Sequence, residues 1–205
     1  MNHYVAGIDE AGRGPLAGPV TAACVVLPSG YSNSEFRDSK KLSSPVRDRL
    51  YLEIIKVSLA YAVVSIGPRR IEKLNIREAT RLAMALAAEK VRNSLEISSK
   101  TKSKKFSLQL LVDGDTSIDT NLSQKTIIKG DEKILAISAA SILAKVSRDR
   151  LMEQLDTYYP QYGFAKHKGY PTKAHLQQIA EHGPARPHRS TFAGVREYLS
   201  RFCRE

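Results

Sequence analysis

The chain has 205 residues, 42% of them hydrophobic and 26% charged, and this balance suits one globular domain with at most a small addition. The formal net charge of +11 favours a polyanionic partner, nucleic acid ahead of an anionic membrane, although a merely soluble basic protein would look the same. The longest apolar run, Ala22–Leu27, is too short to cross a bilayer, and Asp9 precedes any long apolar segment, so we expect neither membrane contact nor a signal peptide. Two isolated cysteines, Cys24 and Cys203, exclude a disulfide framework and fit a reducing cytoplasm.

The predicted order of strands and helices indicates an α/β or α+β fold whose mixed sheet begins antiparallel, with a helical C-terminal addition. The Lys- and Ser-rich stretch Ser98–Lys105 lacks apolar anchors and is predicted to be a mobile surface loop. The predicted strands are His3–Ile8, Val20–Leu27, Leu59–Ile66, Phe106–Val112 and the short Thr126–Ile128. The predicted helices are one that begins at Ser44, then Arg69–Leu95 in two pieces, Lys133–Tyr158, Thr172–Glu181 and Thr191–Phe202.

Acidic residues follow three of the predicted strands: Asp9 with Glu10, then Asp113, then Asp131. Carboxylates at the ends of neighbouring strands can converge on one point above a sheet. A set of four carboxylates without His or Cys offers only hard oxygen ligands, which suit Mg²⁺ or Mn²⁺ rather than zinc. Two such ions about 4 Å apart can stabilise both the attacking and the leaving oxygen of a phosphoryl displacement. An Asp beside Gly is by itself more often a turn residue, but the recurrence of the pattern in a basic protein favours a metal site.

The segment after the first strand combines Asp9 and Glu10 with a loop that contains Gly12, Arg13 and Gly14. Alternation along a strand would send the two acids to opposite faces, so for both to serve one site Glu10 must lie where the strand ends or bulges. Glycine N–H groups can approach an anion closely, as in a phosphate-binding nest. The loop lacks the Gly-Lys-Ser/Thr of a P-loop. Metal-assisted chemistry on a phosphate ester is therefore indicated.

Two later segments are candidates for contact with a nucleic acid. The loop Tyr162–Pro171 mixes aromatic rings with cations, which suits stacking on a sugar or base while phosphates are neutralised. The predicted helix Lys133–Tyr158 carries small hydroxyls and cations on one face, which suits a phosphate backbone and equally a solvated surface, so both interpretations stay open. The residues of this helix face are Ser138, Ser141, Lys145 and Arg148.

Together these motifs resemble bacterial ribonuclease HII from about Tyr4 to Phe192. The resemblance implies a ribonuclease H-like fold, a five-stranded mixed β-sheet flanked by helices. It divides the chain into a catalytic domain over residues 1–158 and a C-terminal helical substrate-binding region over residues 159–205. The motifs that carry it are Gly7-Ile-Asp-Glu-Ala-Gly-Arg-Gly-Pro15, Asp38-Ser-Lys-Lys-Leu42, Leu74-Asn-Ile76, Val112-Asp-Gly114, Lys129-Gly-Asp131, Ala139-Ala-Ser-Ile-Leu-Ala-Lys-Val146 and His167-Lys-Gly-Tyr170.

The resemblance also implies an activity. Members of this family cleave the RNA strand of RNA–DNA hybrids and incise on the 5′ side of a single ribonucleotide embedded in DNA, leaving 3′-hydroxyl and 5′-phosphate ends. This chemistry serves ribonucleotide removal and RNA primer processing. By position within the motifs, two Mg²⁺ or Mn²⁺ ions would be held by Asp9, Glu10, Asp113 and Asp131.

Substrate contacts follow from the same resemblance. The Gly12-Arg13-Gly14 loop would grip the ribonucleotide and its 2′-hydroxyl, and Tyr170 would stack beneath the neighbouring deoxyribose. Lys40 and Lys41 fall in a motif that lines the family's substrate groove. Ser141 and Lys145, from the polar helix face, complete the substrate-binding candidates. We expect a monomer with no obligatory protein partner.

Two alternatives belong beside this interpretation. The sister type, ribonuclease HIII, shares the fold but usually carries an extra N-terminal domain, for which the sequence before His3 leaves no room. The His167–Tyr170 motif also fits the HII type better. A non-catalytic nucleic-acid-binding protein with the same fold is the other alternative, and the intact set of four acids argues against it.

Overall fold

A five-stranded mixed sheet, in the order β3-β2-β1-β4-β5, forms the centre of the computed structural model, which describes residues 2–38, 43–101 and 105–202. The middle strand β1 runs antiparallel to β2 and parallel to β4, while β3 and β5 form the two edges. The predicted mixed sheet with an antiparallel start is therefore confirmed. The strands are β1 (Asn2–Ala11), β2 (Val20–Val26), β3 (Ala60–Ile66), β4 (Phe106–Asp113) and β5 (Ser123–Ile127).

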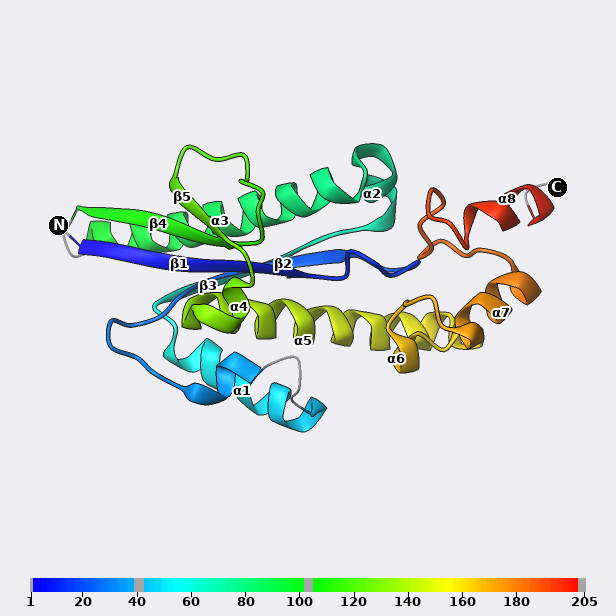
Figure 1. Cartoon of the computed structure of the whole chain (residues 1–205), viewed down its shortest axis with the longest axis horizontal. Coiled ribbons are helices and arrows are strands. Elements are labelled where there is room, and N and C mark those ends of the chain that lie inside the picture. The colour runs from blue at the N-terminus through cyan, green and yellow to red at the C-terminus, as the bar shows by residue number, and fades with distance from the viewer. Residues whose placement is uncertain (1, 39–42, 102–104, 203–205) are drawn as a thin grey trace.

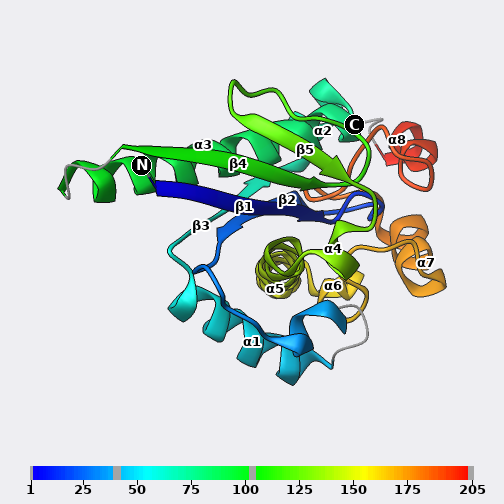
Figure 2. The same ribbon diagram turned by 60° about the vertical axis from the view of Figure 1, so that its left-hand side comes forward.

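Helices cover both faces of the sheet because alternate residues of its buried strands are apolar on each side (Figure 1). Ala22 and Cys24 pack towards the long helix α3, whereas Ala23 and Val25 pack towards α5. Figure 2 shows α5 beneath the sheet, with α1 on its outer side. The helices concerned are α1 (Ser44–Val57), α2 (Pro68–Leu74), α3 (Ile76–Thr101) and α5 (Leu135–Tyr158).

The strand β1 and the helix α5 lie unusually close, and Gly7 makes this possible. A Cβ atom at Gly7 would lie 2.1 Å from the main-chain carbon of Ala136, a distance that real Cβ atoms do not reach. Only a residue without a side chain fits here, because the obstacle is backbone rather than a movable side chain. The close approach brings the next turns of α5, including Ser141, alongside the end of β1.

The C-terminal segment packs against one end of the sheet, at the side away from the N-terminus (Figure 1). A small apolar cluster joins it to the loop between β1 and β2 through Leu16 and Ala17, and to α5 through Met152. None of the described helices combines the length and hydropathy needed to span a bilayer. The short elements of this segment are η2 (Pro160–Tyr162), α6 (Phe164–His167), α7 (Lys173–His182) and α8 (Arg196–Phe202).

The structure corrects two predicted boundaries. The helix α3 continues to Thr101, so the first half of the expected loop Ser98–Lys105 is helical, and residues 102–104 lie outside the described chain. Lys and Ser extend a helix at little cost once buried residues such as Leu95 anchor the preceding turns. The last helix begins at Arg196 rather than Thr191, because Gly194 has a φ of +88°, which no helix accommodates.

The helix expected from Lys133 is divided in two. A single turn, α4 (Gly130–Lys133), precedes α5, and Ile134 between them has an extended backbone with φ −119° and ψ 116°. The Gly130 N–H at the start of α4 donates a hydrogen bond to the side chain of Asp113, which holds this turn against the end of β4. The break therefore places Asp131 next to the end of β4.

Candidate active site

Three of the four predicted metal-binding acids gather at one end of the sheet. Because β1 and β4 are parallel and pair up to Ile8 and Val112, the next residues, Asp9 and Asp113, lie side by side. The Gly130 N–H donates to the Asp113 carboxylate, with 2.6 Å between nitrogen and oxygen. Asp131 follows directly and is buried. Residues more than 100 positions apart thus meet where two neighbouring strands end.

Glu10 reaches this region from the other face of the sheet. The predicted strand His3–Ile8 is too short, because β1 stays regularly paired with β2 up to Ala11, so Glu10 lies within the last residues of the strand and not at a bulge. Alternation therefore holds, and Glu10 points towards α3, where it shares a cavity of about 120 Å³ with Asp113 and Arg77. Asp9 points towards α5 and the hydroxyl of Ser141.

Burial raises the pKa of two of the carboxyl groups, Asp9 and Glu10. Burial raises the pKa of Asp9 well above its usual range, and the charges of Glu10 and Asp113 raise it further, while a hydrogen bond from Ser141 lowers it. Burial likewise raises the pKa of Glu10, against the opposing effect of Arg13, whose guanidinium lies 3.4 Å from the carboxylate. Confined negative charge of this kind is stabilised by a bound cation.

The donor chemistry of these four acids suits a hard divalent cation, because all four offer carboxylate oxygens. Over residues 2–38, 43–101 and 105–202, however, no three His, Cys, Asp or Glu side chains already surround one point as a finished ligand set. Within the described residues, the four acids therefore lie in one region, but their side chains do not surround a common point.

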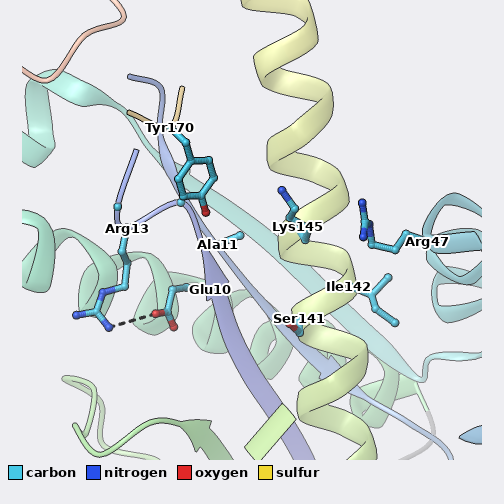
Figure 3. A pocket seen from close by; sticks show the side chains of 10 residues that line it. Glu10, Ala11, Arg13, Arg47, Ser141, Ile142, Lys145 and Tyr170 are labelled. Atoms are coloured by element: carbon cyan, nitrogen blue, oxygen red, sulfur yellow. Dashed lines mark hydrogen bonds and ion pairs between the residues drawn. The ribbon is translucent and has the colours of Figure 1, made fainter. Parts of the chain in front are cut away.

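A larger cavity of about 380 Å³ lies beside Glu10 and joins three separate parts of the chain (Figure 3). The loop after β1 forms one wall, α5 forms another, and Tyr170 from the C-terminal segment closes a third side. Six of the predicted substrate-binding residues line it: Gly12, Arg13, Gly14, Ser141, Lys145 and Tyr170. Lys40 and Lys41, also predicted to contact substrate, lie outside the described residues.

The polar face of α5 is only partly a substrate surface. Ser141 and Lys145 line the cavity, and the Lys145 ammonium also pairs with Asp149 at 2.7 Å. Ser138 is fully buried and donates to the Asp131 carbonyl oxygen at 2.5 Å. Arg148 is 1% exposed and donates to main-chain carbonyls. Helical spacing places these residues on one face, but only Ser141 and Lys145 line the cavity, whereas Ser138 and Arg148 are buried.

Arg47 is a cavity residue that sequence reasoning missed. It lies in the first turn of α1 and lines the cavity opposite the glycine loop (Figure 3). Nothing local distinguishes it from the other arginines of this basic chain, because its position depends on the packing of α1 against α5. It adds a cation to a cavity that already contains Arg13 and Lys145.

Comparisons with known proteins agree with this geometry. A family model described as Ribonuclease HII matches residues 6–195. The ribonuclease HII of Syntrophotalea carbinolica is 47% identical over 195 residues, covering 95% of this chain and 88% of the relative. That of Geotalea daltonii is 50% identical over 195 residues, covering 95% and 85%. The crystal structure of ribonuclease H2 from Pyrococcus horikoshii OT3 matches with a TM-score of 0.77 and 26% identity, covering 98% of this chain and 100% of that one. The chain therefore belongs to the ribonuclease HII family and is a metal-dependent nuclease with a ribonuclease H-like fold.

Proposed function

We propose that this protein hydrolyses the RNA strand of RNA–DNA hybrids and incises on the 5′ side of a single ribonucleotide embedded in duplex DNA. The products carry 3′-hydroxyl and 5′-phosphate ends, and the activity serves ribonucleotide removal and RNA primer processing. The observation that carries this proposal is the cavity in which the glycine loop, α5 and Tyr170 meet beside the strand-end acids. A monomeric state and a cytoplasmic location stay predictions.

In this proposal Asp9, Glu10, Asp113 and Asp131 would hold two Mg²⁺ or Mn²⁺ ions, whose charge would favour ionisation of a water and stabilise negative charge on the departing 3′-oxygen. The burial of Asp9 and the raised pKa values of Asp9 and Glu10 support this assignment, because a cation would relieve the repulsion between their carboxylates. Binding would also draw the acids together, since none of the described side chains forms a finished ligand set.

The walls of the cavity supply recognition. The Gly12-Arg13-Gly14 loop lies where it can contact a sugar hydroxyl, and the 2′-hydroxyl is the group that distinguishes RNA from DNA. Tyr170 offers a 43% exposed ring for stacking on the next sugar. Arg47 and Lys145 add charge for phosphates. The segment 159–205 supplies Tyr170, which supports its role as a substrate-binding region on the catalytic domain 1–158.

The test is one cleavage assay with two labelled duplexes, a long RNA–DNA hybrid and a DNA duplex that contains one ribonucleotide. With Mg²⁺ or Mn²⁺ we expect cleavage of both, with incision on the 5′ side of the single ribonucleotide, and EDTA should abolish both reactions. Cleavage of the hybrid alone would indicate an HIII-like specificity. Binding without any metal-dependent cleavage would contradict the proposal and favour a non-catalytic nucleic-acid-binding protein.

A further inference from the structure

Two arginines lie in the interior behind the substrate-binding loop. Arg148, on α5, is 1% exposed and Arg189, after α7, is fully buried. Burial lowers the pKa of both guanidinium groups, that of Arg189 to about 9, with the positive charge of Arg148 a further cause. A guanidinium group keeps its proton in proteins, so both side chains carry a positive charge in the interior. A buried charge is strongly unfavourable unless hydrogen bonds compensate it, so the partners of these two groups matter.

The partners are main-chain carbonyls, and almost all belong to the loop between β1 and β2. Arg189 donates to three of its carbonyl oxygens over 2.6–3.0 Å, and Arg148 donates to two more of them and to one from the Tyr170 segment over 2.9–3.1 Å. The acceptors are Gly12, Arg13 and Gly18 for Arg189, and Ala17, Pro19 and Lys168 for Arg148.

These bonds fix the direction of two peptide groups in the loop. In a trans peptide the C=O and the following N–H point in opposite directions, and the described chain contains no cis peptide. Arg189 draws the carbonyls of Gly12 and Arg13 inward, so the N–H groups of Arg13 and Gly14 point away from the core. Within the described residues neither N–H has a protein acceptor, and both residues line the 380 Å³ cavity.

Arg148 connects the same loop to Tyr170. It donates to the carbonyl of Lys168, two residues before Tyr170. Its guanidinium carbon lies 5.9 Å from the centre of the Tyr170 ring. Gly12 is adapted to this contact, because a Cβ there would lie 2.0 Å from the Nε atom of Arg148. The Leu16 N–H adds a bond of 2.8 Å to the Gly169 carbonyl.

We infer that Arg189 is a positioning residue for ribonucleotide recognition, because it aims the N–H groups of Arg13 and Gly14 at the 2′-hydroxyl and adjoining phosphate oxygens of the substrate. Arg148 holds this loop at a set distance from Tyr170. The inference rests on the proposed function and extends it from the residues that touch substrate to those that orient them. An apolar side chain could fill the space of Arg189, but it would leave three buried carbonyls without donors and the peptide groups free to turn.

The test compares two binding affinities in each variant, with Ca²⁺ in place of Mg²⁺ to block turnover. One duplex contains a single ribonucleotide and the other is all DNA, and the ratio of the two dissociation constants measures recognition of one hydroxyl. Arg189→Lys keeps the positive charge but cannot reproduce the three hydrogen bonds of the guanidinium group. In this variant we expect the ratio to fall at least tenfold towards one. The control Arg186→Lys makes the same substitution at an exposed position three residues earlier and should leave the ratio unchanged.

The outcomes separate the two levels of the proposal. A wild-type protein that does not distinguish the duplexes would contradict the proposed function itself. If wild type distinguishes the two duplexes and the folded Arg189→Lys variant distinguishes them equally well, only the role of Arg189 is overturned. Loss of general affinity with an unchanged ratio would likewise mean that Arg189 is only structural.

A second measurement needs no variant. In wild-type protein labelled with ¹⁵N, the amide resonances of Arg13 and Gly14 should shift when the ribonucleotide duplex is added and shift much less with the all-DNA duplex. Equal shifts with both duplexes, or none with either in a protein that binds, would overturn the inference even if Arg189→Lys failed to fold.

Discussion

Asp113 combines a structural and a chemical position in one side chain. One carboxylate oxygen accepts the Gly130 N–H at 2.6 Å, which anchors the turn that carries Asp131. The same carboxylate lies beside Asp9 at the ends of paired parallel strands. A substitution that keeps the acceptor oxygen and removes the charge therefore separates the two contributions.

We predict that Asp113→Asn lowers kcat on an RNA–DNA hybrid by at least about a thousandfold, because a metal clamp contributes several kcal/mol to the transition state. The amide oxygen can still accept the Gly130 N–H, so the thermal midpoint of unfolding should change little. Affinity for the hybrid should stay within a few-fold of wild type. Single-turnover cleavage in Mg²⁺ measures the first effect.

The matched control is Asp119→Asn, an exposed aspartate in the loop that follows β4. It removes the same charge in the same way and should leave cleavage near the wild-type rate. Near-normal cleavage by Asp113→Asn, or equal losses in both variants, would contradict the assignment of Asp113 to the metal site.

At the scale of elements, the C-terminal segment is held together by neutral histidines. The His175 Nδ1 atom lies 3.0 Å from the Tyr170 carbonyl and must donate to it, so its Nε2 atom can only accept. His188 must then donate from Nε2 across 3.1 Å, and its Nδ1 accepts the Ala185 N–H. His167 stacks on His175 with ring centres 4.3 Å apart. One defined pair of tautomers therefore connects the residue before Arg189 to the backbone of Tyr170.

This arrangement predicts a loss of stability in mild acid. Burial lowers the pKa of both His175 and His188 to about 4, below the value of about 6.5 for an unfolded chain. The unfolded state therefore binds protons first, and stability falls as the pH drops from about 6.5 towards 4. Urea unfolding at pH 7 and pH 5 should show a difference in unfolding free energy of about 2 kcal/mol from each histidine, or about 4 kcal/mol from the pair.

A variant identifies the source of that difference. His188→Gln should be less stable at pH 7 but should lose clearly less stability between pH 7 and pH 5 than wild type. The exposed His182 provides the control, and His182→Gln should keep the full pH dependence. The same loss in wild type and His188→Gln would mean that other groups cause the acid sensitivity.

Sequence patterns predicted the elements better than the directions of their side chains. The positions of Asp9, Asp113 and Asp131 after strands were visible as apolar runs that end in acid, and parallel pairing then brought the first two together. The buried state of Arg148 was not visible, because its partners are carbonyls about 130 residues earlier in the chain. The segment His188-Arg189-Ser190 looked like one more basic point near the C-terminal loop, and the burial of Arg189 was not visible because main-chain acceptors leave no pattern in a sequence.

At the scale of the whole molecule, the net charge of +11 should dominate affinity for nucleic acid. We predict that the affinity of the Asp113→Asn protein for a hybrid falls by about a thousandfold between 50 mM and 200 mM salt, as expected for about six phosphate contacts. Lys145→Ala should lower the slope of log affinity against log salt concentration by about one, because Lys145 lines the cavity. Fluorescence anisotropy measures both.

Lys90→Ala is the control for that slope. Lys90 is exposed on α3 and does not line the cavity, and its removal changes the net charge equally. Made in the same Asp113→Asn background, this variant should have the slope of Asp113→Asn alone. A flat salt dependence in Asp113→Asn, or the same change of slope in both lysine variants, would contradict a phosphate contact at Lys145.

The hydrogen bonds from Arg189 to the first loop span 171 to 177 residues, and this separation has a consequence for synthesis of the protein. The four acids are all present in a nascent chain once Asp131 has been added, whereas the loop that would read the hydroxyl has its anchor only after Arg189. At about 5–20 residues per second, that interval lasts about 3–12 seconds on the ribosome. A chain whose translation stops within this interval would carry the four acids proposed for phosphodiester cleavage, but it would lack the anchor of the loop proposed to restrict that cleavage to ribonucleotides.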